Sequence, residues 1–332
     1  MLTLPDIEKI TLKLVAQIPK GRVATFREIA IALGDPIAAR AVGSILAQHK
    51  RACPSHRVVS FDGTVTEEQT QLLQAEGVPV KGGRVLSLTK FLFRDFRSEK
   101  PLQKLQEIQN VIRAQMRLVP DRTEYRTVGG VDLSYVGTQG VAAYVRLELP
   151  SLTLIETHTL TQEVRFPYIP SYLAFRELPV MLALLHKLKE QNALADITFV
   201  DGTGTLHHRQ AGIASQLGVM LDIPTIGITK SLLHGEPERD LQTVAPGEIC
   251  YIRIEGQRAG AAIKPTDSSE PFFVSPGHRV DLETAIRLTQ LTLKDLLPEP
   301  IRHAHNASHQ AAQALKRPSP HKSHQLGLFD KA

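Results

Sequence analysis

Residues 128–134 read Val-Gly-Gly-Val-Asp-Leu-Ser, an apolar run that carries one acidic residue, Asp132. Similar runs follow at residues 140–147 and 152–157, and Gly137 lies in the turn between the first two. Short apolar runs bounded by turn residues predict β-strands. We therefore expect three consecutive strands, with an acidic residue inside the first of them.

Helical and strand patterns alternate beyond these three strands. Helical spacing covers residues 175–189 and 211–221, and short buried strands are expected at residues 197–200 and 225–228. Alternation of this kind predicts an α/β domain.

Three acidic residues are placed where this fold could bring them together. Asp132 lies in a strand, Asp201 ends another strand, and Glu177 opens a helix. Acidic side chains at strand ends can converge above one sheet, where a lone group of carboxylates repels itself. Mg²⁺ relieves such repulsion because it prefers carboxylates, waters and phosphate oxygens as ligands. For any one of these residues alone, a solvated surface carboxylate is the competing interpretation.

The first hundred residues have a different pattern. Residues 6–17 have helical apolar spacing, and Thr25 with Glu28 resembles a capping box at the start of a second helix. A third helix is expected at residues 38–47. The last two helices fit either a helix-turn-helix or an ordinary helical hairpin, and the pattern alone leaves both open.

The bulk composition limits the class of protein. At 332 residues, the chain is long enough for two domains. Two cysteines are too few for a disulfide framework, and no secretory signal or membrane-spanning run is found, so we expect a cytoplasmic protein. Residues 302–332 carry four of the five net positive charges and have the composition of a disordered tail, in which the histidines are expected to be solvated.

Residues 102–300 resemble endonuclease V almost throughout. The matching segments, in order, are Gly130–Tyr135, Phe166–Pro170, Phe175–Glu177, Asp201–Gly204, His207–Arg209, Gly212–Ser215, Pro224–Gly227 with Lys230, and Ser275–Arg279. This resemblance implies a ribonuclease H-like, mixed-sheet nuclease that depends on Mg²⁺, with Mn²⁺ as a substitute. It implies cutting of DNA on the 3′ side of deoxyinosine.

The same resemblance implies roles for individual residues. Asp132 and Asp201 are expected to bind the metal, and Glu177 to support the metal or the attacking water. His278 is expected near the metal, and Lys230 to neutralise the scissile phosphate. The loop Pro167, Tyr168, Ile169 and Pro170 is the expected wedge, which takes the place of a flipped base. His207 is expected to line the lesion pocket.

Residues 18–93 resemble the DNA-binding domain of O6-alkylguanine-DNA alkyltransferases and, more closely, the alkyltransferase-like proteins. The matching segments are Gly21–Ala30, Ala39–Gly43, Pro54–Val59, Glu76–Val78 and Gly83–Val85. In that family a cysteine accepts the alkyl group, and here Ser55 holds its position, before His56 and Arg57. A serine hydroxyl is a far weaker nucleophile than a thiolate, so we expect binding without transfer.

Further features of the N-terminal domain follow from this resemblance. Arg40 matches the arginine that fills the gap left by a flipped base, and Phe26 keeps an aromatic ring where the family often has tyrosine. Cys53 lies two residues before Ser55, and we expect an ordinary thiol there.

Near the end of the chain, Gln325, Leu326, Leu328 and Phe329 resemble the short motif by which bacterial repair proteins bind the sliding clamp. A glutamine followed by spaced apolar side chains offers one polar anchor and two apolar contacts for a groove. The clamp is therefore an expected partner beside DNA with deaminated or alkylated bases.

The sequence thus predicts an α/β nuclease preceded by a small, mainly helical, winged-helix-like domain. The expected parts are an N-terminal domain at residues 1–93, a linker at 94–101, a nuclease domain at 102–301 and a tail at 302–332. We expect a monomer that does not bind membranes. Two alternatives stay open, a damage-recognition protein that does not cut and a nuclease for inosine-containing RNA.

Overall fold

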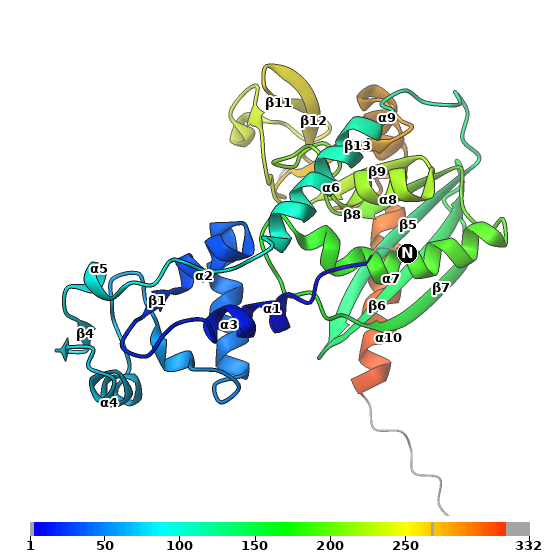
Figure 1. The fold of residues 1–332 in the computed structure, drawn as a ribbon. Helices are drawn as coiled ribbons and strands as arrows, with labels where there is room; N and C mark the ends of the chain where they lie inside the picture. Colours follow the sequence, from blue (N-terminus) through cyan, green and yellow to red (C-terminus); the bar gives the residue numbers. More distant parts are fainter. Residues whose placement is uncertain (1–2, 267–268, 317–332) are drawn as a thin grey trace, which may run out of the picture.

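The computed structural model describes residues 3–266 and 269–316 and shows a helical N-terminal domain beside a larger α/β domain (Figure 1). In the N-terminal domain, the Thr25 hydroxyl accepts a hydrogen bond from the Glu28 amide and caps the second helix, as predicted. Its elements are α1 (Ile7–Val15), β1 (Ala24–Thr25), α2 (Phe26–Leu33), η1 (Pro36–Ala38), α3 (Ala39–Gln48), η2 (Ser55–Arg57), β2 (Val58–Val59), α4 (Glu67–Ala75), β3 (Val80–Lys81), β4 (Arg84–Val85) and α5 (Leu88–Phe91).

The turn between α2 and α3 depends on a glycine. Gly34 has a φ of 109°, a left-handed conformation that ends α2. A Cβ atom at this position would lie 2.7 Å from the amide nitrogen of Gln103, so the turn also packs closely on the next domain's first helix. The predicted mainly helical domain, with two helices joined by a tight turn, is confirmed.

The α/β domain is built on a nine-stranded mixed sheet, which confirms the predicted fold class. The strand order is β10-β11-β12-β13-β9-β8-β5-β6-β7, in which β5, β8 and β9 run parallel and their outer neighbours antiparallel. The strands are β5 (Thr127–Val136), β6 (Gln139–Glu148), β7 (Leu154–Glu163), β8 (Ile197–Asp201), β9 (Thr225–Thr229), β10 (Glu236–Pro237), β11 (Ile249–Ile254), β12 (Gln257–Ile263) and β13 (Phe272–His278).

Helices cover both faces of this sheet, because its central strands are apolar on both sides. Val131 and Val200 pack with α7 (Leu173–Glu190) and α8 (Ile213–Leu221) on one face. Val128 and Phe199 pack with α9 (Leu282–Thr292) and α10 (Glu299–Lys316) on the other. Figure 1 shows α7 and α10 on opposite sides of the strands. Helix α6 (Pro101–Gln115) and the short η3 (Leu241–Thr243) complete the domain.

Helix α10 corrects the prediction of a disordered tail from residue 302. Residues 302–316 are helical, and Ile301, Ala304, Ser308 and Ala312 are buried on one side of the helix. Small residues let α10 lie close to β5, where a Cβ atom on Gly130 would be 2.0 Å from the carbonyl oxygen of Pro300. The predicted clamp-binding residues Gln325, Leu326, Leu328 and Phe329 lie outside the described residues, and their role stays a prediction.

The two domains share an apolar core. Side chains of α1, α2 and α3 form one buried cluster with Leu102 and Leu105 of α6 and with Phe166, Ile169 and Tyr172 of the α/β domain. Residues 94–100 form neither helix nor strand, and Pro101 opens α6. None of the helices in the described part of the chain has the length and apolar character needed to cross a lipid bilayer.

Candidate active site

Asp132 and Asp201 lie side by side because of the register of two parallel strands. Val131 of β5 is paired with Val200 of β8, so the acidic residue that follows each valine stands at the same level of the sheet. Ligand atoms of Asp132, Asp201 and His305 all lie within 4.8 Å of one another. Two carboxylates and an imidazole at this spacing form a donor set that fits a divalent cation.

Helix α10 supplies the third member of this group and a further contact. The Ser308 hydroxyl donates a hydrogen bond of 2.7 Å to Oδ2 of Asp132, and Nδ1 of His305 lies 3.2 Å from the same oxygen. Sequence reasoning missed both residues because it treated this segment as a tail. The buried positions 301, 304, 308 and 312 repeat at helical spacing, a signal that was present in the sequence.

Glu177 reaches the group from α7, on the other face of the sheet. Burial and the charges of Asp132 and Asp201 raise the pKa of the Glu177 carboxyl to about 8, although a hydrogen bond from Tyr135 acts in the opposite direction. The Tyr135 hydroxyl donates that bond at 3.2 Å, and the guanidinium of Arg176 stacks over the Tyr135 ring at 4.6 Å. Tyr135, itself in contact with Arg176, therefore fixes the position of the Glu177 carboxyl.

The pKa of Asp201 is raised for the same reasons as that of Glu177. Burial and the charge of Asp132 raise the pKa of Asp201 to about 7, while Lys230 and His305 act in the opposite direction. Lys230 follows the end of β9, the strand beside β8. Its ammonium group therefore supplies positive charge to the cluster from the same edge of the sheet.

The structure does not place His278 in this group. His278 pairs with Thr225 at the start of β9, whereas Asp201 pairs with Ile228 near its end. Three residues of strand separate these levels by about 10 Å. The His278 ring instead contacts the carboxylate of Asp222 at 3.3 Å and accepts a hydrogen bond from the Arg117 amide at 3.2 Å. The expected position of His278 near a metal is therefore wrong, and His305 lies there.

The loop of residues 166–172, here called the Tyr168 loop, combines a buried base with an exposed tip. Ile169 is fully buried, whereas Tyr168 is 60% exposed. Pro167 and Pro170 flank these two residues and restrict the backbone on either side. An exposed aromatic ring on a stiff loop is suited to stacking rather than to core packing.

His207 is buried at the base of this loop, and its expected role in lining the lesion pocket stays a prediction. Its Nε2 lies 3.1 Å from the carbonyl oxygen of Ser171, and its Nδ1 accepts a hydrogen bond of 3.2 Å from the Arg209 amide. Burial lowers the pKa of His207 to about 4. The neutral ring therefore donates to Ser171 and helps to fix the loop.

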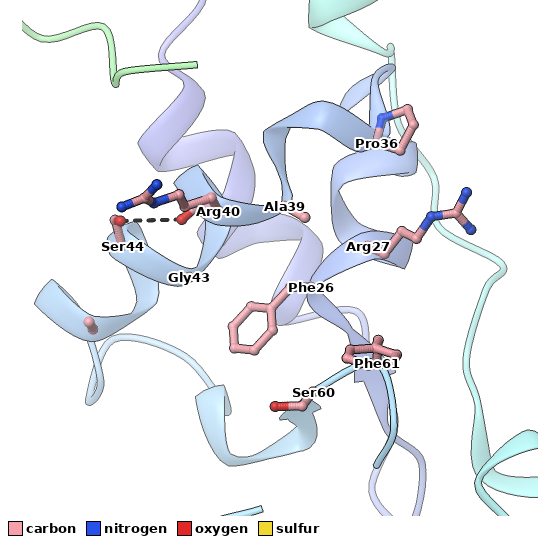
Figure 2. A pocket seen from close by; sticks show the side chains of 10 residues that line it. Phe26, Arg27, Pro36, Ala39, Arg40, Gly43, Ser44, Ser60 and Phe61 are labelled. Atoms are coloured by element: carbon pink, nitrogen blue, oxygen red, sulfur yellow. Dashed lines mark hydrogen bonds between the residues drawn. The ribbon is translucent and has the colours of Figure 1, made fainter. Parts of the chain in front are cut away.

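An open pocket of about 660 Å³ lies on the N-terminal domain, between α2, α3 and the loop after β2 (Figure 2). Phe26 and Phe61 form its apolar side, while Arg27 and Arg40 supply positive charge at its lining. Phe61 is 85% exposed, an unfavourable position for an apolar ring unless a partner covers it. Sequence reasoning identified Phe26 and Arg40 and missed Phe61, which lies outside the motifs that it used.

The residues around Ser55 keep a polar network but have no thiol in it. Glu76 accepts hydrogen bonds from Arg57 and lies 2.9 Å from Nε2 of His56. The Arg57 guanidinium, with the smaller effect of His56, lowers the pKa of Glu76 to about 2. The Ser55 hydroxyl donates to the carbonyl oxygen of Lys50 at 2.8 Å. Burial raises the pKa of the Cys53 thiol, which disfavours the reactive thiolate.

Comparisons with known proteins agree with this division of the chain. Residues 109–306 match the family model of endonuclease V, and residues 6–78 match that of the 6-O-methylguanine DNA methyltransferase DNA-binding domain. The chain is 34% identical to a bifunctional methyltransferase/endonuclease of Thermoplasma volcanium over 313 residues, which cover 91% of this chain and 89% of that protein.

Solved structures are similar to the larger domain. The catalytic domain of human endonuclease V has 29% identity and a TM-score of 0.62, and the match covers 67% of this chain and all of that one. Endonuclease V of Ciona intestinalis, solved with a 23mer DNA containing an inosine followed by a ribo-adenosine, has 27% identity and a TM-score of 0.59. That match covers 66% of this chain and 100% of the other.

The buried side chain of His207 predicts how the stability of the protein depends on pH. Its pKa is about 4 in the folded protein and near 6.5 when exposed. Between these values the unfolded chain binds a proton that the folded protein does not, so acid favours unfolding. Relative to wild type, H207Q should therefore lose less stability on acidification, by about 2 kcal/mol between pH 7 and pH 5. Urea titrations at both pH values measure this difference, and equal losses in the two proteins would contradict it.

Proposed function

This chain belongs to the endonuclease V family and carries an alkyltransferase-type DNA-binding domain, and from this premise we propose a specific activity for it. The chain is a DNA repair endonuclease that nicks DNA on the 3′ side of deoxyinosine. The observation that carries the proposal is the convergence of Asp132, Asp201 and His305 within 4.8 Å. An intact group of this kind favours cutting over recognition alone.

Each residue of the cluster has its own role in the proposed reaction. Asp132, Asp201 and His305 would hold a divalent cation, Mg²⁺ or Mn²⁺, because their oxygen and nitrogen donors fit either ion. When bound, such an ion would supply charge stabilisation at the scissile phosphate and an activated water. Positive charge here would also oppose the burial and the like charges that raise the pKa values of Asp201 and Glu177. Glu177 orients the water, and Lys230 balances charge on the phosphate.

The Tyr168 loop contacts the lesion. Its exposed ring enters the base stack where inosine has left, and Pro167 and Pro170 keep the ring from folding back onto the protein. Unstacking a base costs a few kcal/mol, and less for a weakly paired base such as inosine. The loop therefore contributes to the choice of inosine over a normal base pair.

The N-terminal domain binds DNA with alkylated guanine and flips the base without repairing it. Arg40 fills the gap in the stack, and Phe26 with Phe61 offers aromatic surface to the flipped nucleotide. The Ser55 hydroxyl donates a hydrogen bond to the backbone carbonyl oxygen of Lys50, and the thiol of Cys53 has a raised pKa, so neither side chain is prepared for alkyl transfer. His56 and Arg57 stay bound to Glu76 and support the fold around the pocket.

A second substrate is supported by one observation. The structure of the Ciona intestinalis protein was solved with DNA in which a ribo-adenosine follows the inosine. A strand with a 2′-OH at this position is therefore a competing substrate for this chain. Nicking of matched DNA and RNA strands, each with one inosine, decides between the two.

Variants of the cluster test the assignment of the metal ligands. D132N and H305A should each lower the nicking rate by about 100-fold or more, because each removes a donor to the cation. Binding of the same DNA, measured by fluorescence anisotropy, should stay close to wild type. Calorimetric titration with Mn²⁺ should show weaker binding by both variants.

The matched control is H303A on the same helix. His303 lies 3.3 Å from Glu299 and is not part of the cluster. This variant should nick at the wild-type rate. Wild-type nicking by H305A would show that α10 supplies no ligand.

Variants of the N-terminal pocket test the second activity. R40A and F61A should each weaken binding of a duplex with one O6-methylguanine by about tenfold, because stacking of this kind is worth 1–3 kcal/mol per base. Anisotropy measures the change, and K13A removes an exposed positive charge outside the pocket as a control. Mass spectrometry after incubation should show no added methyl group. A stable methyl adduct on Cys53 or Ser55 would overturn the proposal of binding without transfer.

A further inference from the structure

A hydrogen-bonded junction connects the two domains at the base of the Tyr168 loop. The Tyr172 hydroxyl donates to Oδ2 of Asp35 at 2.7 Å. Nε2 of Gln106, on α6, donates to the same carboxylate oxygen at 2.8 Å and lies 2.7 Å from the Tyr172 hydroxyl. Tyr172 is fully buried, whereas Asp35 and Gln106 are half-buried, so this junction lies at the edge of the shared core.

Asp35 contacts both the DNA-binding helices and the nuclease. Its Oδ1 accepts a hydrogen bond of 3.0 Å from the Ile37 amide and so caps η1, the turn that leads directly into α3 and Arg40. Its Oδ2 is the oxygen bound by Tyr172 and Gln106. One carboxylate therefore fixes the start of the helix that carries Arg40 and the end of the Tyr168 loop.

On the nuclease side, Tyr172 is tied to the backbone of the loop. Its amide donates to the carbonyl oxygen of Ile169 at 3.0 Å. The preceding residue, Ser171, has a φ of 64°, and its carbonyl oxygen accepts a hydrogen bond of 3.1 Å from Gln109 of α6. A shift of the Tyr172 ring would therefore move the backbone on which Tyr168 stands.

Apolar packing joins the same surfaces. Phe166, Ile169 and Tyr172 belong to one buried cluster with residues of α1, α2 and α3. The N-terminal domain thus forms part of the core under the Tyr168 loop, while Tyr168 itself points to solvent. Burial and the carboxylate of Asp35 raise the pKa of the Tyr172 hydroxyl, which keeps its proton and remains a donor.

We infer that Asp35 of the N-terminal domain is a positioning residue for the Tyr168 loop, so that this domain builds part of the nuclease's lesion contact. Asp35 acts through Tyr172 and does not touch DNA. The inference rests on the proposed role of Tyr168 at inosine. It also implies that DNA contacts made by Arg40 and by Tyr168 are held at a fixed spacing through one side chain.

The test uses the full chain and three variants, Y172F, D35N and the double variant. Y172F keeps the buried ring and removes only the hydroxyl, and D35N keeps one carbonyl oxygen for the η1 cap. Each single variant should lower kcat/KM for paired inosine by about tenfold, the size expected for a lost hydrogen bond to a charged group. Nicking of inosine in single-stranded DNA, where no base pair is opened, should stay within about twofold of wild type.

The double variant and a control distinguish positioning from general destabilisation. The double variant should lose no more than either single variant, because both remove the same interaction. Q17A serves as control, since Gln17 makes two hydrogen bonds with the backbone of Arg97 in the segment that connects the domains, and none with Asp35 or Tyr172. It should nick both substrates as wild type does.

Fluorescence of 2-aminopurine placed beside inosine adds a readout that needs no cutting. Insertion of Tyr168 unstacks the neighbouring base and brightens it, and Y172F should reduce this increase. If the wild-type protein did not nick inosine-containing DNA, the proposed function would be wrong. The fluorescence measurement would still test the role of Asp35, because it needs no cutting. Additive losses in the double variant, equal losses on both substrates, or unchanged fluorescence in Y172F would each overturn the inference.

Discussion

Two carboxylates held side by side in a buried position create the repulsion on which the active site is built. Asp132 and Asp201 occupy the same level of neighbouring parallel strands, so the hydrogen bonds of the sheet prevent them from separating. Burial of the carboxylate, and after it the charge of Asp132, raises the pKa of Asp201. Three nearby groups reduce this repulsion: the hydroxyl of Ser308, the imidazole of His305 and the ammonium group of Lys230. A divalent cation between the two carboxylates would offset the rest of their repulsion.

The last helix, α10, reaches this pair of carboxylates because it packs closely on β5. Strand β5 presents Gly130, Asp132 and Ser134 to α10, and these small or polar residues leave space for close approach. A bulky apolar residue at position 130 would push the helix away and remove His305 from the site. The packing of α10 and the geometry of the cluster of Asp132, Asp201 and His305 are therefore one structural feature. The N-terminal domain packs against the base of the Tyr168 loop.

Local patterns in the sequence predicted much of this fold, and the reasons are physical. The three strands around Asp132, the capped helix after Thr25 and the acid at the end of β8 depend on neighbouring residues, so spacing and capping reveal them. Helix α10 was missed because its composition resembles that of a solvated tail. Beyond Ile301, its buried face consists of alanine and serine, which composition alone does not mark as buried. His278 was misplaced because the sequence motif around it does not show which end of the neighbouring strand it faces. Only the strand register shows that it pairs with the start of β9. The contact between Asp35 and Tyr172 joins residues 137 positions apart and depends on how two domains pack.

The central claim is that two strands and the last helix together form one cation site. A crystal of the full chain soaked in Mn²⁺ tests it most directly, because anomalous scattering locates the ion without reference to activity. The account predicts a peak bonded to Asp132, Asp201 and His305, with Glu177 close by. A peak beside His278 and Asp222, or one that leaves His305 without contact to the ion, would contradict it.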